Sequence, residues 1–129
     1  MEAVLGRVLG IGGVFYKAKD KPALLKWYRD VLGLDIGDWG IFFPAEEPAR
    51  HPGAGAVISM FKTDTDYFDP SSCDFMINLV VDELDSLLVQ AASQGVAPVK
   101  TYDEINGKVA HLIDPEGVKL ELWEPRVMA

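Results

Sequence analysis

Residues 107–125, GKVAHLIDPEGVKLELWEP, constrain the fold of this chain more than any other stretch. Two apolar runs, 109–113 and 118–123, flank the tetrapeptide DPEG at 114–117. Proline at the second position and glycine at the fourth are typical of a type I turn between two strands. The pattern therefore predicts a β-hairpin near the end of the chain.

One carboxylate lies inside the second of these apolar runs, where Glu121 stands between Leu120 and Leu122. An ionised carboxylate in an apolar strand is costly unless it is paired, bound to a metal or facing a wet cavity. His111 lies ten residues earlier, on the predicted partner strand. We therefore take His111 and Glu121 as candidate catalytic residues, with the imidazole as general acid or base and Glu121 orienting it. Two structural alternatives stay open: a buried His–Glu pair without chemistry, and Lys119 as the partner of Glu121.

Length and charge narrow the class of protein. The chain has 129 residues, 49% of them hydrophobic and 25% charged, as in an ordinary single globular domain. No apolar run approaches the roughly 18 residues of a membrane span, and residues 1–14 lack the pattern of a secretory signal, so we expect a cytoplasmic protein without membrane contact. A net charge of −8 opposes nucleic-acid binding, although it would attract a cationic ligand if it lined a cleft.

Two histidines and one cysteine are present, and two of these three residues have no predicted role. Cys73 is the single cysteine, so an internal disulfide is excluded, and we expect a bystander thiol. His51 lies in a Pro- and Gly-rich loop at 44–55, where a solvated side chain is expected.

The chain contains two similar halves. Asp20 and Gly33 enclose one helical apolar pattern, and Asp82 and Gly95 enclose another, each 62 positions later. The strand candidates around these helices are 8–18, 34–38, 40–43 and 56–62 in the first half, and 75–81 followed by about three strands in the second. The pattern predicts βαβββ twice within one domain: a first unit at about 8–63, an acidic linker at about 64–74 and a second unit at about 75–125.

Three segments together resemble one superfamily. They are IGGVFYKAKDKPALLKWYRDVLGL at 11–34, FMINLVVDELDSLL at 75–88 and AHLIDPEGVKLELWEP at 110–125. They resemble the vicinal oxygen chelate superfamily, which includes glyoxalase I, fosfomycin-resistance proteins, extradiol dioxygenases and bleomycin-resistance proteins. The resemblance implies an α+β fold in which two βαβββ modules form a curved mixed sheet around a pocket. It also implies a homodimer.

The resemblance further implies one divalent metal held by side chains from four strands. Glu121 matches the carboxylate ligand of the last strand. The other three ligand positions fall on residues that are poor donors for a hard cation: Gly13, Ser59 and Met76. We therefore expect no cofactor and no metal at the usual site, unless other residues such as His111 are recruited.

Strand alternation predicts which side chains would line a pocket. If Glu121 points inward, residues two positions away on its strand share its side, and the same parity applies to the other strands. The ligand-binding candidates are Phe15, Ser59, Phe61, Met76, Asn78, Lys119 and Trp123. Their alternative is an ordinary role in the core or in the pocket wall. As candidates they describe a mostly apolar cavity with few polar groups, which is typical of a small-molecule site.

Three functions remain open on the sequence. The first is a metal-free protein that binds or sequesters a small organic ligand, cationic or aromatic, as the resemblance to bleomycin-resistance proteins implies. The second is an enzyme that uses His111 and Glu121 for metal-free proton transfer. The third is a metal-dependent glyoxalase-like lyase or isomerase, or a dioxygenase, with substitute ligands.

Overall fold

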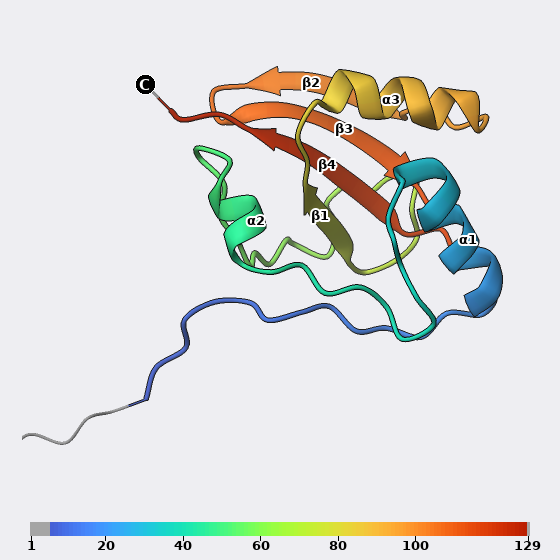
Figure 1. The fold of residues 1–129 in the computed structure, drawn as a ribbon, viewed down its shortest axis with the longest axis horizontal. Helices are drawn as coiled ribbons and strands as arrows, with labels where there is room; N and C mark the ends of the chain where they lie inside the picture. Colours follow the sequence, from blue (N-terminus) through green and yellow to red (C-terminus); the bar gives the residue numbers. More distant parts are fainter. Residues whose placement is uncertain (1–5, 129) are drawn as a thin grey trace, which may run out of the picture.

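A computed structural model describes residues 6–128 (Figure 1). Its helices and strands, in chain order, are α1 (Lys21–Leu32), α2 (Glu46–Ala49), β1 (Met76–Val80), α3 (Leu84–Ser93), β2 (Lys100–Glu104), β3 (Gly107–Ile113) and β4 (Lys119–Pro125). The strands form one mixed sheet in the order β1-β4-β3-β2, in which β1 is parallel to β4 and the other pairs are antiparallel. The α+β fold class is therefore confirmed.

The second half folds as the expected βαβββ sequence, and its hairpin turn lies where the DPEG motif predicts it. Gly117 N donates to Asp114 O over 3.0 Å, which closes the turn between β3 and β4. The Asp114 carboxylate accepts from the backbone N–H groups of Glu116 and Val118 at 2.8 and 3.0 Å. The side chain of Asp114 thus satisfies turn donors that the sheet leaves unpaired.

Helix α1 begins and ends at the residues that the sequence predicts. Asp20 is the N-cap, and its Oδ1 accepts from Ala23 N over 3.2 Å. Gly33 ends the helix with a left-handed φ of 69°, a conformation that glycine adopts without the steric cost of a Cβ.

The predicted cap of the second helix is wrong. Helix α3 begins after Glu83, at Leu84, and neither Asp82 nor Glu83 provides a side-chain cap. The Glu124 carboxylate instead accepts from Leu84 N over 2.7 Å. A side chain from the end of β4 therefore caps α3, and local sequence around the helix does not reveal such a long-range contact.

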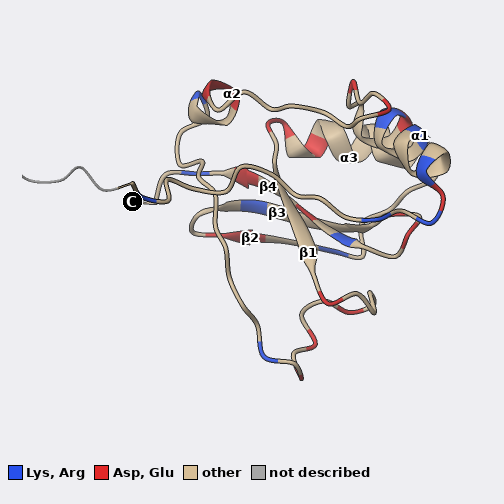
Figure 2. Cartoon of the chain, turned by 90° about the horizontal axis from the view of Figure 1, so that it is seen from below, with Lys and Arg blue, Asp and Glu red and all other residues tan. Residues whose placement is uncertain are grey.

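The core lies between one face of the sheet and helices α1 and α3. Leu120 and Leu122 of β4 pack there, with Ala110 and Leu112 of β3. The helices contribute Leu24, Tyr28, Val31 and Leu32 from α1 and Leu84 and Ala91 from α3. Figure 2 shows α1 and α3 on one side of the strands and the linker before β1 on the other. The face of the sheet that carries Glu121 is thus the face away from the helices.

The first half differs from the expected set of paired strands. Within residues 6–128, the segments 8–18, 34–38, 40–43 and 56–62 run as extended chain, and a single bridge joins Gly37 to Gly40. Figure 1 shows the segment before α1 running clear of the sheet. Phe15 is 94% exposed and Met60 is 84% exposed. Apolar alternation signals the propensity for a strand, but a strand exists only where a neighbour accepts its hydrogen bonds, and within residues 6–128 these segments have no such neighbour beyond the Gly37–Gly40 bridge.

Candidate functional site

A row of four polar side chains crosses the face of the sheet opposite the helices. Lys100 of β2 is the register partner of His111 of β3, His111 is the partner of Glu121 of β4, and Glu121 is the partner of Asn78 of β1. Because residues in register share one face, all four strands contribute one residue to the same line. We call these four residues the polar row.

Glu121 is the centre of the polar row. Its Oε2 accepts from His111 Nε2 at 2.9 Å and from the Tyr67 hydroxyl, and its Oε1 accepts from Asn78 Nδ2 at 2.8 Å. Burial opposes ionisation of this carboxyl, but the hydrogen bonds from His111, Tyr67 and Asn78 outweigh it and lower its pKa from 4.5 to about 2. Glu121 is therefore an anion held by donors at neutral pH, and its weak basicity makes it a poor proton acceptor.

Two tyrosines that the sequence analysis missed complete the cluster. The Tyr67 hydroxyl lies 2.5 Å from that of Tyr102 and 3.3 Å from His111 Nε2. Tyr102 Oη also lies 3.3 Å from Glu121 Oε2. Desolvation is the largest cause that raises the pKa of each phenol, so both are neutral donors. Tyr102 lies two positions from Lys100 on β2, a strand whose place the sequence did not indicate. Tyr67 lies in the aperiodic linker, where no sequence period indicates its direction.

Two lysines bring positive charge to the same cluster. Lys119 is 3% exposed, and its Nζ donates to the backbone carbonyls of Tyr67 and Asp69 at 2.7 and 2.9 Å. The same ammonium lies 5.3 Å from the centroid of the Tyr67 ring, and Lys100 Nζ lies 5.9 Å from it. Desolvation by burial lowers the pKa of Lys119. The sequence alternative in which Lys119 is the partner of Glu121 is not what the structure shows, because Lys119 binds the linker backbone.

His111 is fully buried, and in the described part of the chain only one of its two ring nitrogens has a hydrogen-bond partner. It is 0% exposed, and the Tyr67 and Tyr102 rings lie edge-on to it with centroid distances of 5.3 and 5.6 Å. Since Oε2 of Glu121 accepts at Nε2, that nitrogen carries the proton. Its Nδ1 is buried without a hydrogen-bond partner in the described part of the chain.

The structure gathers some of the predicted pocket residues and separates others. The Phe61 ring stacks on the Tyr67 ring, with a centroid distance of 5.5 Å and an interplanar angle of 13°. Met76 is the register partner of Lys119, while the Trp123 indole donates to Asn106 O over 3.0 Å. Phe15 lies exposed on the extended segment before α1, outside the cluster, and Ser59 is exposed on the 56–62 segment.

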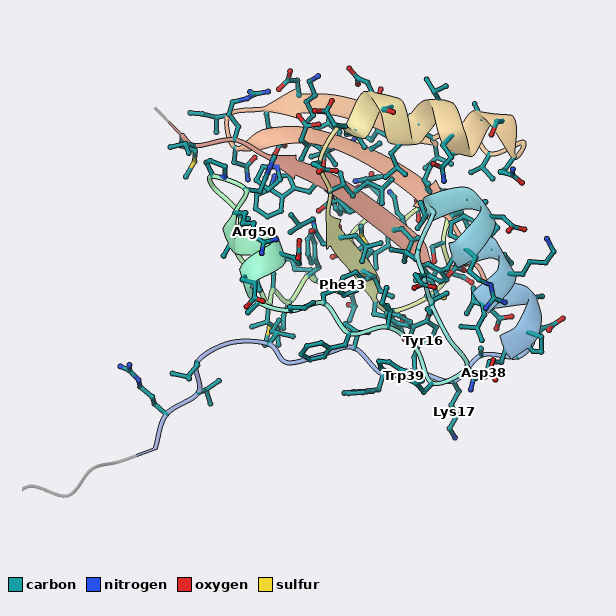
Figure 3. All side chains as sticks on the ribbon, in the orientation of Figure 1. Tyr16, Lys17, Asp38, Trp39, Phe43 and Arg50 are labelled. Carbon is teal, nitrogen blue, oxygen red and sulfur yellow. The ribbon has the colours of Figure 1, made fainter. Side chains whose placement is uncertain are left out.

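A hollow of about 740 Å³ lies at a different place, beside β1. Its wall combines the 43–51 segment with residues of β1, α1 and α3, among them Phe43, Arg50, Leu79, Asp82 and Gln90. Figure 3 shows Phe43 and Arg50 on this segment, and Tyr16 and Trp39 on the extended chain beyond it. Asn78 is the one residue that both lines this hollow and belongs to the polar row. The hollow therefore touches the polar row at Asn78, while residues of α1 and α3 and Leu122 place most of its wall on the helix side of the sheet.

The donor set does not fit the divalent metal that the sequence resemblance implies. The groups nearest to Glu121 are its hydrogen-bonded histidine, two neutral phenols and two lysines. The positive charge of the lysines repels a metal ion. Gly13 and Ser59 lie on extended segments, and Met76 offers a thioether. Within residues 6–128 no three His, Cys, Asp or Glu side chains gather closely enough to hold a metal ion. No helix in the same range is long and apolar enough to cross a membrane.

Comparison with solved structures identifies the fold. The chain matches the crystal structure of a glyoxylase/bleomycin resistance protein/dioxygenase domain from Frankia sp. EAN1pec with a TM-score of 0.56 and 18% identity, over 93% of this chain and 100% of that domain. A glyoxalase / bleomycin resistance protein from Catenulispora acidiphila DSM 44928 matches with a TM-score of 0.47 and 23% identity, over 83% of this chain and 90% of that one. The sequence matches no protein-family model and no curated protein.

This chain therefore has the glyoxalase/bleomycin-resistance/dioxygenase fold, which is the fold that the sequence resemblance implies. The match to the Frankia domain includes most of the first half. Within residues 6–128 that half shows no paired strands beyond the Gly37–Gly40 bridge, so its βαβββ arrangement stays a prediction.

Proposed function

We propose that this protein binds a small organic ligand, without a metal, on the polar row between Lys100 and Asn78. The observation that carries the proposal is the setting of Glu121: a carboxylate only 19% exposed, surrounded by donors and by the rings of Tyr67 and Tyr102. A few convergent polar groups among aromatic walls are what a ligand site needs for orientation and affinity. An aromatic ligand suits these walls, whereas a cationic ligand would meet Lys119 and Lys100.

The test is a ligand screen by nuclear magnetic resonance on the wild-type protein, with neutral and cationic aromatic compounds. We expect binders to shift the side-chain signals of Asn78 and Trp123, and Glu121→Gln to weaken them by about tenfold, since a charged acceptor is lost. Glu46→Gln, at an exposed position of α2, is the matched control. Binders that Glu121→Gln leaves unaffected, or the absence of any binder, would contradict the proposal.

A second candidate is metal-free proton transfer by His111, supported by its 2.9 Å bond to Glu121 and by the free Nδ1. The burial of His111 and the weak basicity of Glu121 favour binding over this chemistry. His111→Ala would abolish turnover of a substrate in the enzyme and would only weaken binding in a ligand-binding protein. His51→Ala serves as the control, because His51 contacts the Pro125 carbonyl, away from the polar row.

We also propose that the working form is a homodimer. The support is the exposed apolar chain of the first half, which includes Phe15, Ile58 and Met60. Exposed apolar residues in such number favour an interaction surface when they are contiguous. Within residues 6–128, β1 pairs with β4 alone, so its other edge offers backbone groups to which a second copy could add a strand.

A further inference from the structure

We propose that Tyr67 occupies the place of the ligand, and that the polar row is built to receive a neutral phenol that displaces it. The inference rests on the proposed function and names the chemical class of the ligand. The contacts of the Tyr67 hydroxyl and those of its ring support it.

The hydroxyl of Tyr67 contacts three polar groups at the centre of the site. It donates to Glu121 Oε2 and lies 2.5 Å from Tyr102 Oη and 3.3 Å from His111 Nε2. A carboxylate, a second phenol and an imidazole thus converge on one hydroxyl that a linker residue supplies. A ligand without a hydroxyl at this point would take one charge-assisted donor from Glu121 Oε2 and leave it with His111 and Tyr102, which costs affinity.

The ring of Tyr67 also has contacts with aromatic rings and with two ammonium groups. Phe61 stacks on it, His111 meets it edge-on, and the ammonium groups of Lys119 and Lys100 lie 5.3 and 5.9 Å from its centroid. Stacking and cation–π attraction both favour an electron-rich ring. These contacts do not depend on the backbone of Tyr67, so a free phenol can make them.

The charges around the ring decide between phenol classes. A phenolate would repel the Glu121 anion, so the ligand carries a neutral hydroxyl that donates. A para substituent would extend toward the position of the Tyr67 backbone, where Lys119 lies 2.7 Å from the Tyr67 carbonyl. An ammonium group on that substituent would meet the Lys119 ammonium. The site therefore selects neutral phenols over phenols with a cationic side chain.

Tyr67 competes with such a ligand as long as it stays bound. A competitor that fills the site most of the time lowers the apparent affinity by the fraction of time in which the site is free. Replacing Tyr67 by alanine removes this competition and leaves Glu121, Tyr102, His111 and Phe61 in place.

The experiment titrates 4-ethylphenol, ethylbenzene and tyramine into the wild-type protein and into Tyr67→Ala by calorimetry. We expect 4-ethylphenol to bind Tyr67→Ala about tenfold more tightly than it binds wild type, and ethylbenzene and tyramine to bind the variant at least about tenfold more weakly than 4-ethylphenol. Tyr16→Ala, whose hydroxyl contacts Tyr28 far from the polar row, should not change the affinity for 4-ethylphenol. If Tyr67→Ala does not fold, Tyr67→Leu replaces it, because leucine keeps an apolar contact with Phe61 and has no ring or hydroxyl.

Equal affinity of Tyr67→Ala for 4-ethylphenol and ethylbenzene would overturn the inference, as would an affinity for 4-ethylphenol that equals that of wild type. Other compounds that bind wild type in a Glu121-dependent way would leave the proposed function standing in that case. If no compound binds either protein at the polar row, both the inference and the proposed function fail.

Discussion

His111 and Glu121 are direct partners across β3 and β4, and Nε2 of the histidine donates to Oε2 of the carboxylate over 2.9 Å. The same oxygen accepts from Tyr67, a residue 54 positions away in the chain. One carboxylate oxygen therefore joins the hairpin to the linker. The stability of the fold and the shape of the site depend on the same atom.

The ionisation of Glu121 predicts how stability changes with pH. Its pKa is about 2 in the folded protein against 4.5 ordinarily, so the stabilisation is complete above pH 4.5 and is lost as the pH falls from about 4.5 to about 2. The loss should be on the order of 3 kcal/mol. Urea unfolding of wild type and Glu121→Gln between pH 2 and pH 6 measures it. The acid loss should be smaller in the variant, whereas Glu46→Gln should follow wild type; parallel curves for all three proteins would refute the assignment.

Removal of the His111 side chain should destabilise the protein strongly. His111→Ala opens a cavity in a fully buried position and takes a donor from Glu121, so we expect a loss of about 2–4 kcal/mol in the free energy of unfolding. His51→Ala, which removes one contact with a backbone carbonyl in a partly buried loop, should cost less than about 1 kcal/mol. Equal losses in the free energy of unfolding for the two variants, measured with urea, would show that the buried His111–Glu121 pair contributes no more stability than the His51 contact.

Gly107 should tolerate no side chain. It has a φ of 143°, and a Cβ there would lie 2.2 Å from the Glu124 carbonyl oxygen in β4. Gly107→Ala should therefore cost about 3 kcal/mol or more, or prevent folding. At Gly12 a Cβ would meet no atom within 4 Å, so Gly12→Ala should stay within about 0.5 kcal/mol of wild type. Thermal unfolding followed by circular dichroism compares the two variants.

The cap of α3 by Glu124 is also open to test. Glu124→Ala removes the acceptor of Leu84 N and should lower the free energy of unfolding by about 1 kcal/mol. Glu104→Ala, an exposed substitution in β2, should have little effect. Hydrogen exchange at the Leu84 amide should accelerate in the first variant and not in the second; unchanged protection in Glu124→Ala would argue that the cap is absent in solution.

The proposed homodimer predicts two different outcomes for two exposed apolar residues. Ile58 in the first half and Val89 on α3 are 74% and 72% exposed. If a second copy covers the first half, Ile58→Lys should weaken the dimer by about tenfold or more, while Val89→Lys should not. Sedimentation velocity over a range of protein concentrations measures both. A wild-type protein that is monomeric throughout would end the proposal.

Local signals in the sequence predicted the second half well. The DPEG turn lies where it was expected in that half, and in the first half so do the Asp20 cap and the Gly33 stop of α1; all three depend on a few neighbouring residues. The pairing of His111 with Glu121 also follows from the hairpin, because the turn determines the register of its strands. These features could be predicted because each arises from contacts close in the chain.

Contacts between distant segments could not be predicted in the same way. Tyr67 reaches Glu121 from a linker without periodicity, and the Glu124 cap of α3 joins residues 40 positions apart. The apolar segment 8–18 has the composition of a strand, but composition does not say which neighbour will accept its hydrogen bonds. The polar row illustrates the same limit, since alternation indicated Asn78 but not the strand from which Lys100 comes.

The polar row also makes an incorrect strand register energetically unfavourable. Side chains alternate between faces, so a slip of β4 by one residue would turn Glu121 toward the helices and bring Leu120 and Leu122 to the site. That slip would bury the carboxylate without its donors His111 and Asn78, and it would remove two leucines from the core. Both changes raise the free energy of the shifted sheet. The residues proposed to receive the ligand thus also discriminate the native strand alignment from its nearest competitors while the protein folds.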